Sequence, residues 1–120
     1  MEIIFLDTNI LIEHFKGKSI LNGKPLNNFC ISEIILMELY QGARNKSDLA
    51  FIKKNLKGIN IVETNSDIIS LSLTILEKYN LSHNMKIYDA IIASTTLIYD
   101  LKLWTLNKKD FRYIPNLKLY

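Results

Sequence analysis

Acidic residues stand beside apolar segments at three points of the sequence. Asp7 directly follows the apolar run Ile3–Leu6, Asp89 directly precedes the apolar run Ala90–Ala93, and Glu38 lies inside a segment that is otherwise almost entirely apolar. Carboxylates that converge on one place cannot all stay ionised without a counter-charge. Mg²⁺ and Mn²⁺ prefer oxygen ligands, so one shared divalent cation would account for the three acids together.

Each acid also has a simpler explanation when it is taken alone. Asp7 and Asp89 could each cap the helix that follows. Glu38 could be a solvent-facing residue of a half-buried helix, although its neighbours at i−4 and i−3 are apolar. Asp110 lies in a polar segment and could be a solvated loop residue. An exposed Glu38, far from Asp7 and Asp89, would favour these simpler explanations.

The spacing of apolar residues predicts short strands that alternate with helices. The predicted strands are 2–6, 29–31, 59–63, 102–105 and 117–120, and the predicted helices are 8–16, 33–43, 47–57, 66–79 and 89–101. Strands joined by helical stretches pair in parallel, so the expected fold class is α/β, a three-layer α/β/α sandwich with a mainly parallel central sheet. Such sheets bind ligands at the carboxyl ends of their strands, which is where Asp7 is expected.

The composition limits the class of protein. With 120 residues, 48% of them hydrophobic, the chain is expected to form one domain over residues 1–120. Its apolar runs are too short to span a bilayer, and no basic region precedes the first of them, so no membrane segment or signal peptide is expected. Cys30 is the only cysteine, which favours a reducing cytoplasm. The net charge of +3 comes mostly from lysine and favours a phosphate-rich partner.

Other kinds of catalytic site find little support in the sequence. Cys30 and the histidines His14 and His83 are too scattered to build a zinc site, and both histidines are expected at the surface. The sequence contains no Gly-rich phosphate loop and no nucleophilic serine motif. Chemistry based on a hard metal and carboxylates is therefore the leading interpretation.

Four segments of the sequence carry a family resemblance: FLDTNILI (5–12), ISEIILMELYQGAR (31–44), YDAIIAST (88–95) and TLNKKDFRYIPNLKL (105–119). In this order and spacing, which cover essentially the whole chain, they resemble the PIN-domain nucleases and specifically the VapC-type toxins of bacterial toxin–antitoxin pairs. The resemblance implies an α/β/α fold with an acidic pocket that binds Mg²⁺ or Mn²⁺. It also implies endoribonuclease activity on RNA, inhibition by a cognate antitoxin protein, and a homodimer.

The resemblance further assigns the acids of the pocket. Asp7, Glu38 and Asp89 match the three core acids of the family. Some members carry the fourth acid where this chain has Asn107, and others carry it where this chain has Asp110. We favour Asp110, which leaves Asn107 as a polar group of the pocket.

Polar residues beside these acids have supporting roles in this interpretation. Thr8 and Asn9 would orient Asp7 or a bound water, and one of the two is also a natural cap for the helix 8–16. Thr105 would be a second polar group of the pocket. Lys108 and Lys109 are candidate phosphate contacts, although an ordinary solvated pair of charges explains them equally well.

The expected chemistry is metal-assisted hydrolysis of an RNA phosphodiester bond. Asp7 and Asp89 would hold the metal, while Glu38 would either complete its coordination shell or orient the attacking water. Two alternatives stay open: a housekeeping PIN nuclease that has no antitoxin, and a non-catalytic module that binds nucleic acid or protein on the same fold.

Overall fold

The central feature of the fold is a parallel sheet. The structure is a computed structural model that describes residues 2–120. Within this range the sheet has four strands in the order β3-β2-β1-β4. They are β1 (Ile4–Leu6), β2 (Phe29–Ser32), β3 (Asn60–Val62) and β4 (Lys102–Trp104). All the pairings are parallel, which confirms the predicted type of sheet.

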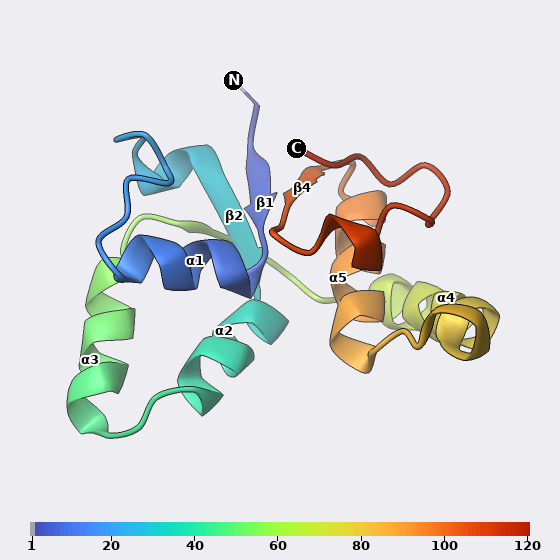
Figure 1. The fold of residues 1–120 in the computed structure, drawn as a ribbon, viewed down its shortest axis with the longest axis horizontal. Helices are drawn as coiled ribbons and strands as arrows, with labels where there is room; N and C mark the ends of the chain where they lie inside the picture. Colours follow the sequence, from blue (N-terminus) through green and yellow to red (C-terminus); the bar gives the residue numbers. More distant parts are fainter. Residues whose placement is uncertain (1) are drawn as a thin grey trace.

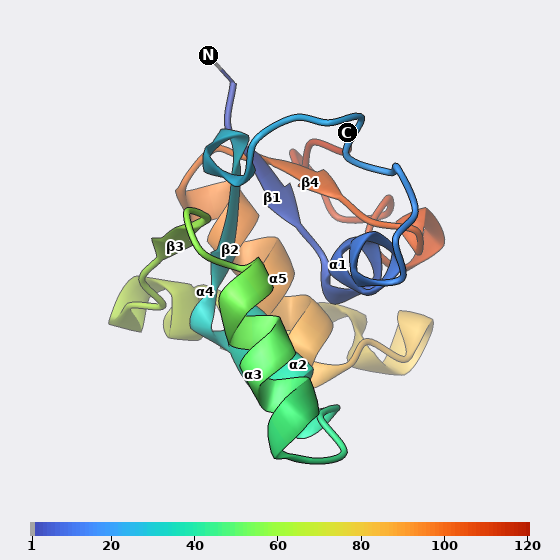
Figure 2. The same ribbon diagram turned by 90° about the vertical axis from the view of Figure 1, so that its left-hand side faces the viewer.

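Helices cover both faces of this sheet. They are α1 (Thr8–Phe15), α2 (Glu33–Gln41), α3 (Lys46–Asn55), α4 (Ser66–His83) and α5 (Ile87–Ile98). In Figure 2, α1 and α3 lie in front of the sheet and α4 and α5 lie behind it, while Figure 1 shows α2 continuing beyond the end of β2. The α/β/α sandwich is therefore confirmed. No helix among residues 2–120 is both long and apolar enough to cross a membrane.

The core surrounds β1, the inner strand between β2 and β4. Phe5 and Leu6 are completely buried, and so is Leu103 on the neighbouring β4. Because successive side chains of a strand point to opposite faces, β1 contacts both helical layers. Ile10 of α1 and Ile92 of α5 supply the matching buried side chains. This burial on both faces explains why the strand is a continuous apolar run rather than an alternating one.

Several predicted boundaries are wrong. α4 continues to His83 instead of ending near residue 79, because only at Asn84 does the backbone turn left-handed (φ +50°) and end the helix. α5 begins at Ile87 rather than at residue 89. In place of a strand at 117–120, the structure has an isolated bridge between Leu103 and Leu119.

Candidate active site

The four predicted acids come from separate elements that meet at the carboxyl end of the sheet. Asp7 directly follows β1, Glu38 lies on α2, Asp89 lies in the first turn of α5, and Asp110 ends a 3₁₀ turn that follows β4. Figure 1 shows α2 and the first turn of α5 below the carboxyl end of β1. The charges of Asp7, Asp110 and Glu38 all raise the pKa of Asp89, so the four side chains share one electrostatic environment.

Hydrogen bonds hold the carboxylate of Asp7 in place. The Thr8 backbone N–H donates to Oδ1 at 2.8 Å, and the Thr105 hydroxyl donates to Oδ2 at 2.7 Å. The Asn9 side-chain amide also donates to Oδ2, at 3.3 Å. Burial raises the pKa of Asp7, and these hydrogen bonds oppose that effect because they stabilise the charged form. Asp7 is therefore both the cap of α1 and a buried, oriented carboxylate; the cap expected at Thr8 or Asn9 is wrong.

The pairing of β1 with β4 explains how these distant residues meet. The backbone N–H of Asp7 donates to the carbonyl of Trp104 at 3.0 Å, which places Thr105 beside the carboxylate. The Leu106 N–H then donates to the side-chain oxygen of Asn9 at 3.1 Å, and the Asn107 N–H donates to the Thr105 hydroxyl at 3.0 Å. Asn107 thus joins this network through its main chain.

Glu38 is partly buried and faces the other acids. Burial raises its pKa, and the charge of Asp7 raises it further. The nearby Thr8 hydroxyl lowers this pKa in part, but the two groups do not meet in hydrogen-bond geometry. Within the described part of the chain, Oε1 of Glu38 and Oγ1 of Thr8 are both buried without a hydrogen-bond partner. A buried carboxylate oxygen in that state is costly, and Glu38 is partly buried rather than fully solvent-facing, which favours the explanation that it has a cation or partner.

Asp89 has the most strongly perturbed carboxylate of the four. Burial and then the charges of Asp7, Asp110 and Glu38 raise its pKa from 3.8 to about 6. Asp89 does not cap α5, since the helix begins two residues earlier, after Lys86. The charge of Lys86 lowers the pKa of Asp89. Sequence reasoning missed this cation, although its position three residues before the acid was a usable signal.

The donor set suits a hard divalent cation. It consists of carboxylate and hydroxyl oxygens, and it contains an unpartnered buried oxygen on Glu38 and an excess of negative charge around Asp89. Among residues 2–120, no three Asp, Glu, His or Cys side chains are already arranged as a metal cage. Mg²⁺ does not need such a cage, because it is commonly bound by one or two carboxylates and keeps several waters. The residues therefore fit Mg²⁺ or Mn²⁺.

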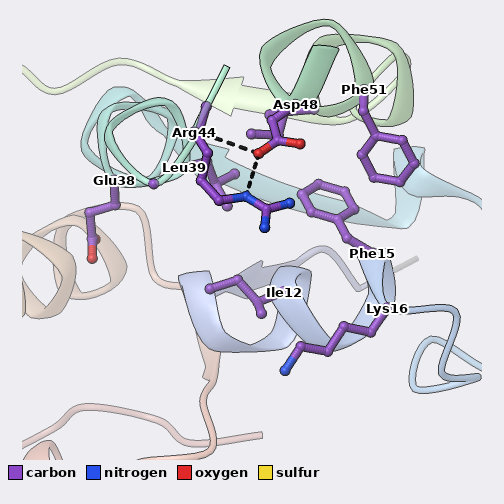
Figure 3. A pocket seen from close by; sticks show the side chains of 11 residues that line it. Ile12, Phe15, Lys16, Glu38, Leu39, Arg44, Asp48 and Phe51 are labelled. Carbon is purple, nitrogen blue, oxygen red and sulfur yellow. Dashed lines mark hydrogen bonds and ion pairs between the residues drawn. The ribbon is translucent and has the colours of Figure 1, made fainter. Parts of the chain in front are cut away.

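An apolar groove of about 340 Å³ begins beside Glu38 and runs between α1, α2 and α3. Figure 3 shows Ile12, Phe15 and Phe51 along it, with Glu38 at one end. Arg44 donates to Asp48 at 2.9 Å on the rim. Sequence reasoning missed the groove, because it arises from the packing of three helices rather than from a motif.

Another, more polar hollow lies along the segment that follows β4. Thr105, Asn107, Lys108 and Lys109 line it, and both lysines are exposed. The predicted phosphate contacts therefore flank the residue that holds Asp7, on the loop that also carries Asp110.

The fold and the site define a three-layer α/β protein with four electrostatically coupled acids at the carboxyl end of a parallel sheet. The profile of the PIN-domain family matches residues 4–117, almost the whole chain. The chain belongs to the PIN-domain family.

Several known proteins are similar to the chain over nearly its whole length. It is 28% identical to the Mycobacterium tuberculosis protein named Ribonuclease VapC19, over 94% of this chain and 95% of that protein. It is 32% identical to a chain of a toxin–antitoxin complex from Klebsiella pneumoniae, with a TM-score of 0.76 and coverage of 95% and 94%. A chain of VapBC2 from Rickettsia felis, bound to a DNA fragment from its promoter, has a TM-score of 0.80 at 26% identity, with coverage of 98% and 97%.

Proposed function

We propose that this chain is a metal-dependent endoribonuclease, folded as one domain, that acts as the toxin of a VapBC-type toxin–antitoxin pair. The observation that carries the proposal is the electrostatic coupling of four acids: burial, and then the charges of Asp7, Asp110 and Glu38, raise the pKa of Asp89 to about 6. Among the relatives, the name ribonuclease supports RNA as the substrate, and the toxin–antitoxin complexes support an antitoxin as the partner.

In this proposal Asp7 and Asp89 hold Mg²⁺ or Mn²⁺, and Glu38 completes the coordination shell or orients a water. When bound, the cation would polarise the scissile phosphate and make a bound water more acidic. Thr105 and Asn9 keep Asp7 oriented and favour its ionised form through their hydrogen bonds.

Lysines outside the acidic pocket would contact the RNA backbone. Lys108 and Lys109 line the hollow beside Thr105, where flanking phosphates could lie. Contacts of this kind depend on charge rather than on base sequence, so they would weaken as the salt concentration rises.

Replacing Asp7 by Asn tests the catalytic site. Expression of wild type, followed by sequencing of new RNA ends, should show discrete cleavage sites that the Asp7→Asn variant does not produce. Asp67→Asn is a matched control, because Asp67 is an exposed acid in the first turn of α4. A variant at Asp7 that cleaves RNA at the wild-type rate would refute the assignment.

Metal dependence is tested with the purified protein. EDTA should stop cleavage, and Mg²⁺ or Mn²⁺ should restore it. Isothermal titration with Mg²⁺ should show binding to wild type and weaker binding to Glu38→Gln, which keeps the size of the side chain but removes its charge. Full activity in chelator would refute a metal-dependent mechanism.

The apolar groove is the proposed binding site of the antitoxin. It opens beside Glu38, so a segment bound there would lie next to the acidic pocket and could block RNA. Phe51 lines the groove and is 47% exposed, so its ring is in contact with water when nothing is bound there. An antitoxin segment with apolar side chains would cover it.

Co-expression with the antitoxin, which a toxin of this type is expected to have encoded in a neighbouring short gene, tests this binding site. Phe51→Asp should abolish co-purification of the antitoxin while RNA cleavage persists, because Phe51 is not among the acids. Leu81→Asp, at an exposed apolar residue away from the groove, should leave the complex intact. Equal binding by wild type and Phe51→Asp would place the antitoxin elsewhere.

A further inference from the structure

Three aromatic side chains form a cluster between the end of α4 and the C-terminal loop. The rings of His83 and Tyr113 are stacked, with centroids 3.8 Å apart and 13° between their planes. Tyr79 meets both rings edge-on, at centroid distances of 5.7 Å and 5.1 Å. The Ser82 hydroxyl also lies 2.7 Å from Nδ1 of His83. Three neighbours therefore hold this exposed imidazole in one orientation.

The cluster joins the two segments that carry acids of the pocket. His83 ends α4, and the next helix has Asp89 in its first turn. Tyr113 follows the 3₁₀ turn that ends at Asp110. Burial raises the pKa of Tyr113, and so do the charges of Asp89 and Asp110, which places its hydroxyl within electrostatic range of both acids. The cluster therefore lies close in sequence to both acids, and Tyr113 is coupled to them electrostatically.

Packing alone does not account for the exposed member of this cluster. The C-terminal loop is already anchored by Phe111 and Ile114, which are buried in the core, and the contact of Tyr79 with Tyr113 already joins the loop to α4. His83 adds a solvent-facing ring whose orientation is restrained. Single-stranded nucleic acids bind on such surfaces, because unpaired bases stack on tyrosine and histidine rings.

We infer that the stacked rings of His83 and Tyr113 are a platform for an unpaired nucleobase of the RNA, next to the phosphodiester bond held at the acids. This inference rests on the proposed function, and it specifies how the ribonuclease would bind its RNA substrate. Four carboxylates carry more negative charge than one divalent cation neutralises, so groups outside the acids are expected to contribute to the binding of the RNA. Base stacking supplies such energy with little dependence on sequence, and it favours single-stranded over duplex RNA.

Steady-state kinetics of His83 variants tests the platform. The substrate is a single-stranded RNA of about ten nucleotides, taken from the strongest cleavage site found for wild type. His83→Ala should raise KM by roughly 5- to 150-fold, the range expected for the loss of one stacked base, while kcat changes much less. His83→Phe should restore KM, because a phenyl ring also stacks. Leu81→Ala is the matched control on the same exposed end of α4 and should match wild type.

A binding cycle separates stacking from any general effect of the mutation. Fluorescence anisotropy with Asp7→Asn, which is expected to bind without cleaving, measures Kd for the same RNA with an abasic site moved through it one position at a time. At one position the abasic site should weaken binding to Asp7→Asn, yet have little effect on the double variant Asp7→Asn/His83→Ala. If moving the abasic site changes Kd by the same factor in both proteins at every position, the inference of a stacking platform is wrong.

The outcomes distinguish this inference from the proposed function. If wild type cleaves RNA and His83→Ala has the wild-type KM, the platform is wrong and the ribonuclease proposal stands. If wild type neither cleaves nor binds RNA, both are wrong. Circular dichroism melts should show that every variant is folded at the assay temperature, with His83→Ala slightly less stable because it loses the stacking contact with Tyr113.

Discussion

Replacing Asp89 by Asn is expected to stabilise the metal-free protein above about pH 6. Burial and three neighbouring acids raise the pKa of Asp89 from 3.8 to about 6. Between these pH values the folded state holds a proton that the unfolded chain has released. Stability therefore falls as pH rises through this range, and above it the ionised carboxylate carries its full cost. The amide side chain of the Asp89→Asn variant has no proton to lose and so avoids this cost.

The size of the effect follows from the pKa. A rise from 3.8 to about 6 corresponds to about 3 kcal/mol as an upper limit, at 1.36 kcal/mol per pH unit. Asp89 is only partly buried, so solvent screening reduces this figure. Losing a negative charge in the first turn of α5 also removes roughly 0.5 kcal/mol of favourable interaction with the helix dipole. We expect a net gain of about 1–2 kcal/mol in the free energy of unfolding.

Urea unfolding in EDTA measures this gain. At pH 8 the Asp89→Asn variant should be more stable than wild type, and the difference should shrink as the pH falls from 6 to 4. Asp67→Asn should show the opposite sign, because an exposed acid in a first helical turn is favourable. Mg²⁺ should stabilise wild type more than Asp89→Asn. An Asp89→Asn variant that is no more stable at pH 8, or a gain that is independent of pH, would refute the electrostatic reasoning.

Other positions give independent predictions. Thr105→Val removes the hydroxyl that donates to Asp7 at 2.7 Å, so kcat/KM for RNA should fall by roughly 10- to 100-fold, as for other groups that orient a ligand. The pH profile of kcat/KM should also move to higher pH, because this hydrogen bond lowers the pKa of Asp7. Asp110→Asn should lower cleavage more than Asn107→Ala does in the same assay if Asp110 is the fourth acid; the reverse order would assign Asn107. Ile92→Ala should lower the free energy of unfolding by about 2–5 kcal/mol in urea titrations, because this fully buried side chain would leave a cavity, and a smaller loss would show that the core collapses around it.

Local sequence patterns were enough to predict the layers of the fold. The apolar run of β1 is followed at once by a helix, and this order alone implies a parallel sheet with helices on its faces. The end of α4 was predicted wrongly because Asn80, Ser82 and His83 look like loop residues but remain helical until Asn84 adopts a left-handed backbone. Polarity marks exposure to solvent, and an exposed helix end is as polar as a loop.

The acids of the site could be predicted, but most of their partners could not. Asp7, Glu38 and Asp89 are conspicuous because each lies beside apolar residues. The aromatic cluster was missed, since Tyr79 and Tyr113 are far apart in sequence and each has an ordinary role when it is considered alone. A side chain that acts through a long-range contact leaves no local pattern in the sequence.

The fourth position of the pocket shows what the structure adds where a motif is ambiguous. Asn107 is tied to the network by its backbone N–H, which donates to Thr105, and any residue other than proline could make that contact. Asp110 acts through its side chain, because its charge raises the pKa of both Asp7 and Asp89. A carboxylate that already repels two others is where a shared cation would gain the most electrostatic energy. This difference between a main-chain role and a side-chain role supports Asp110 as the fourth acid.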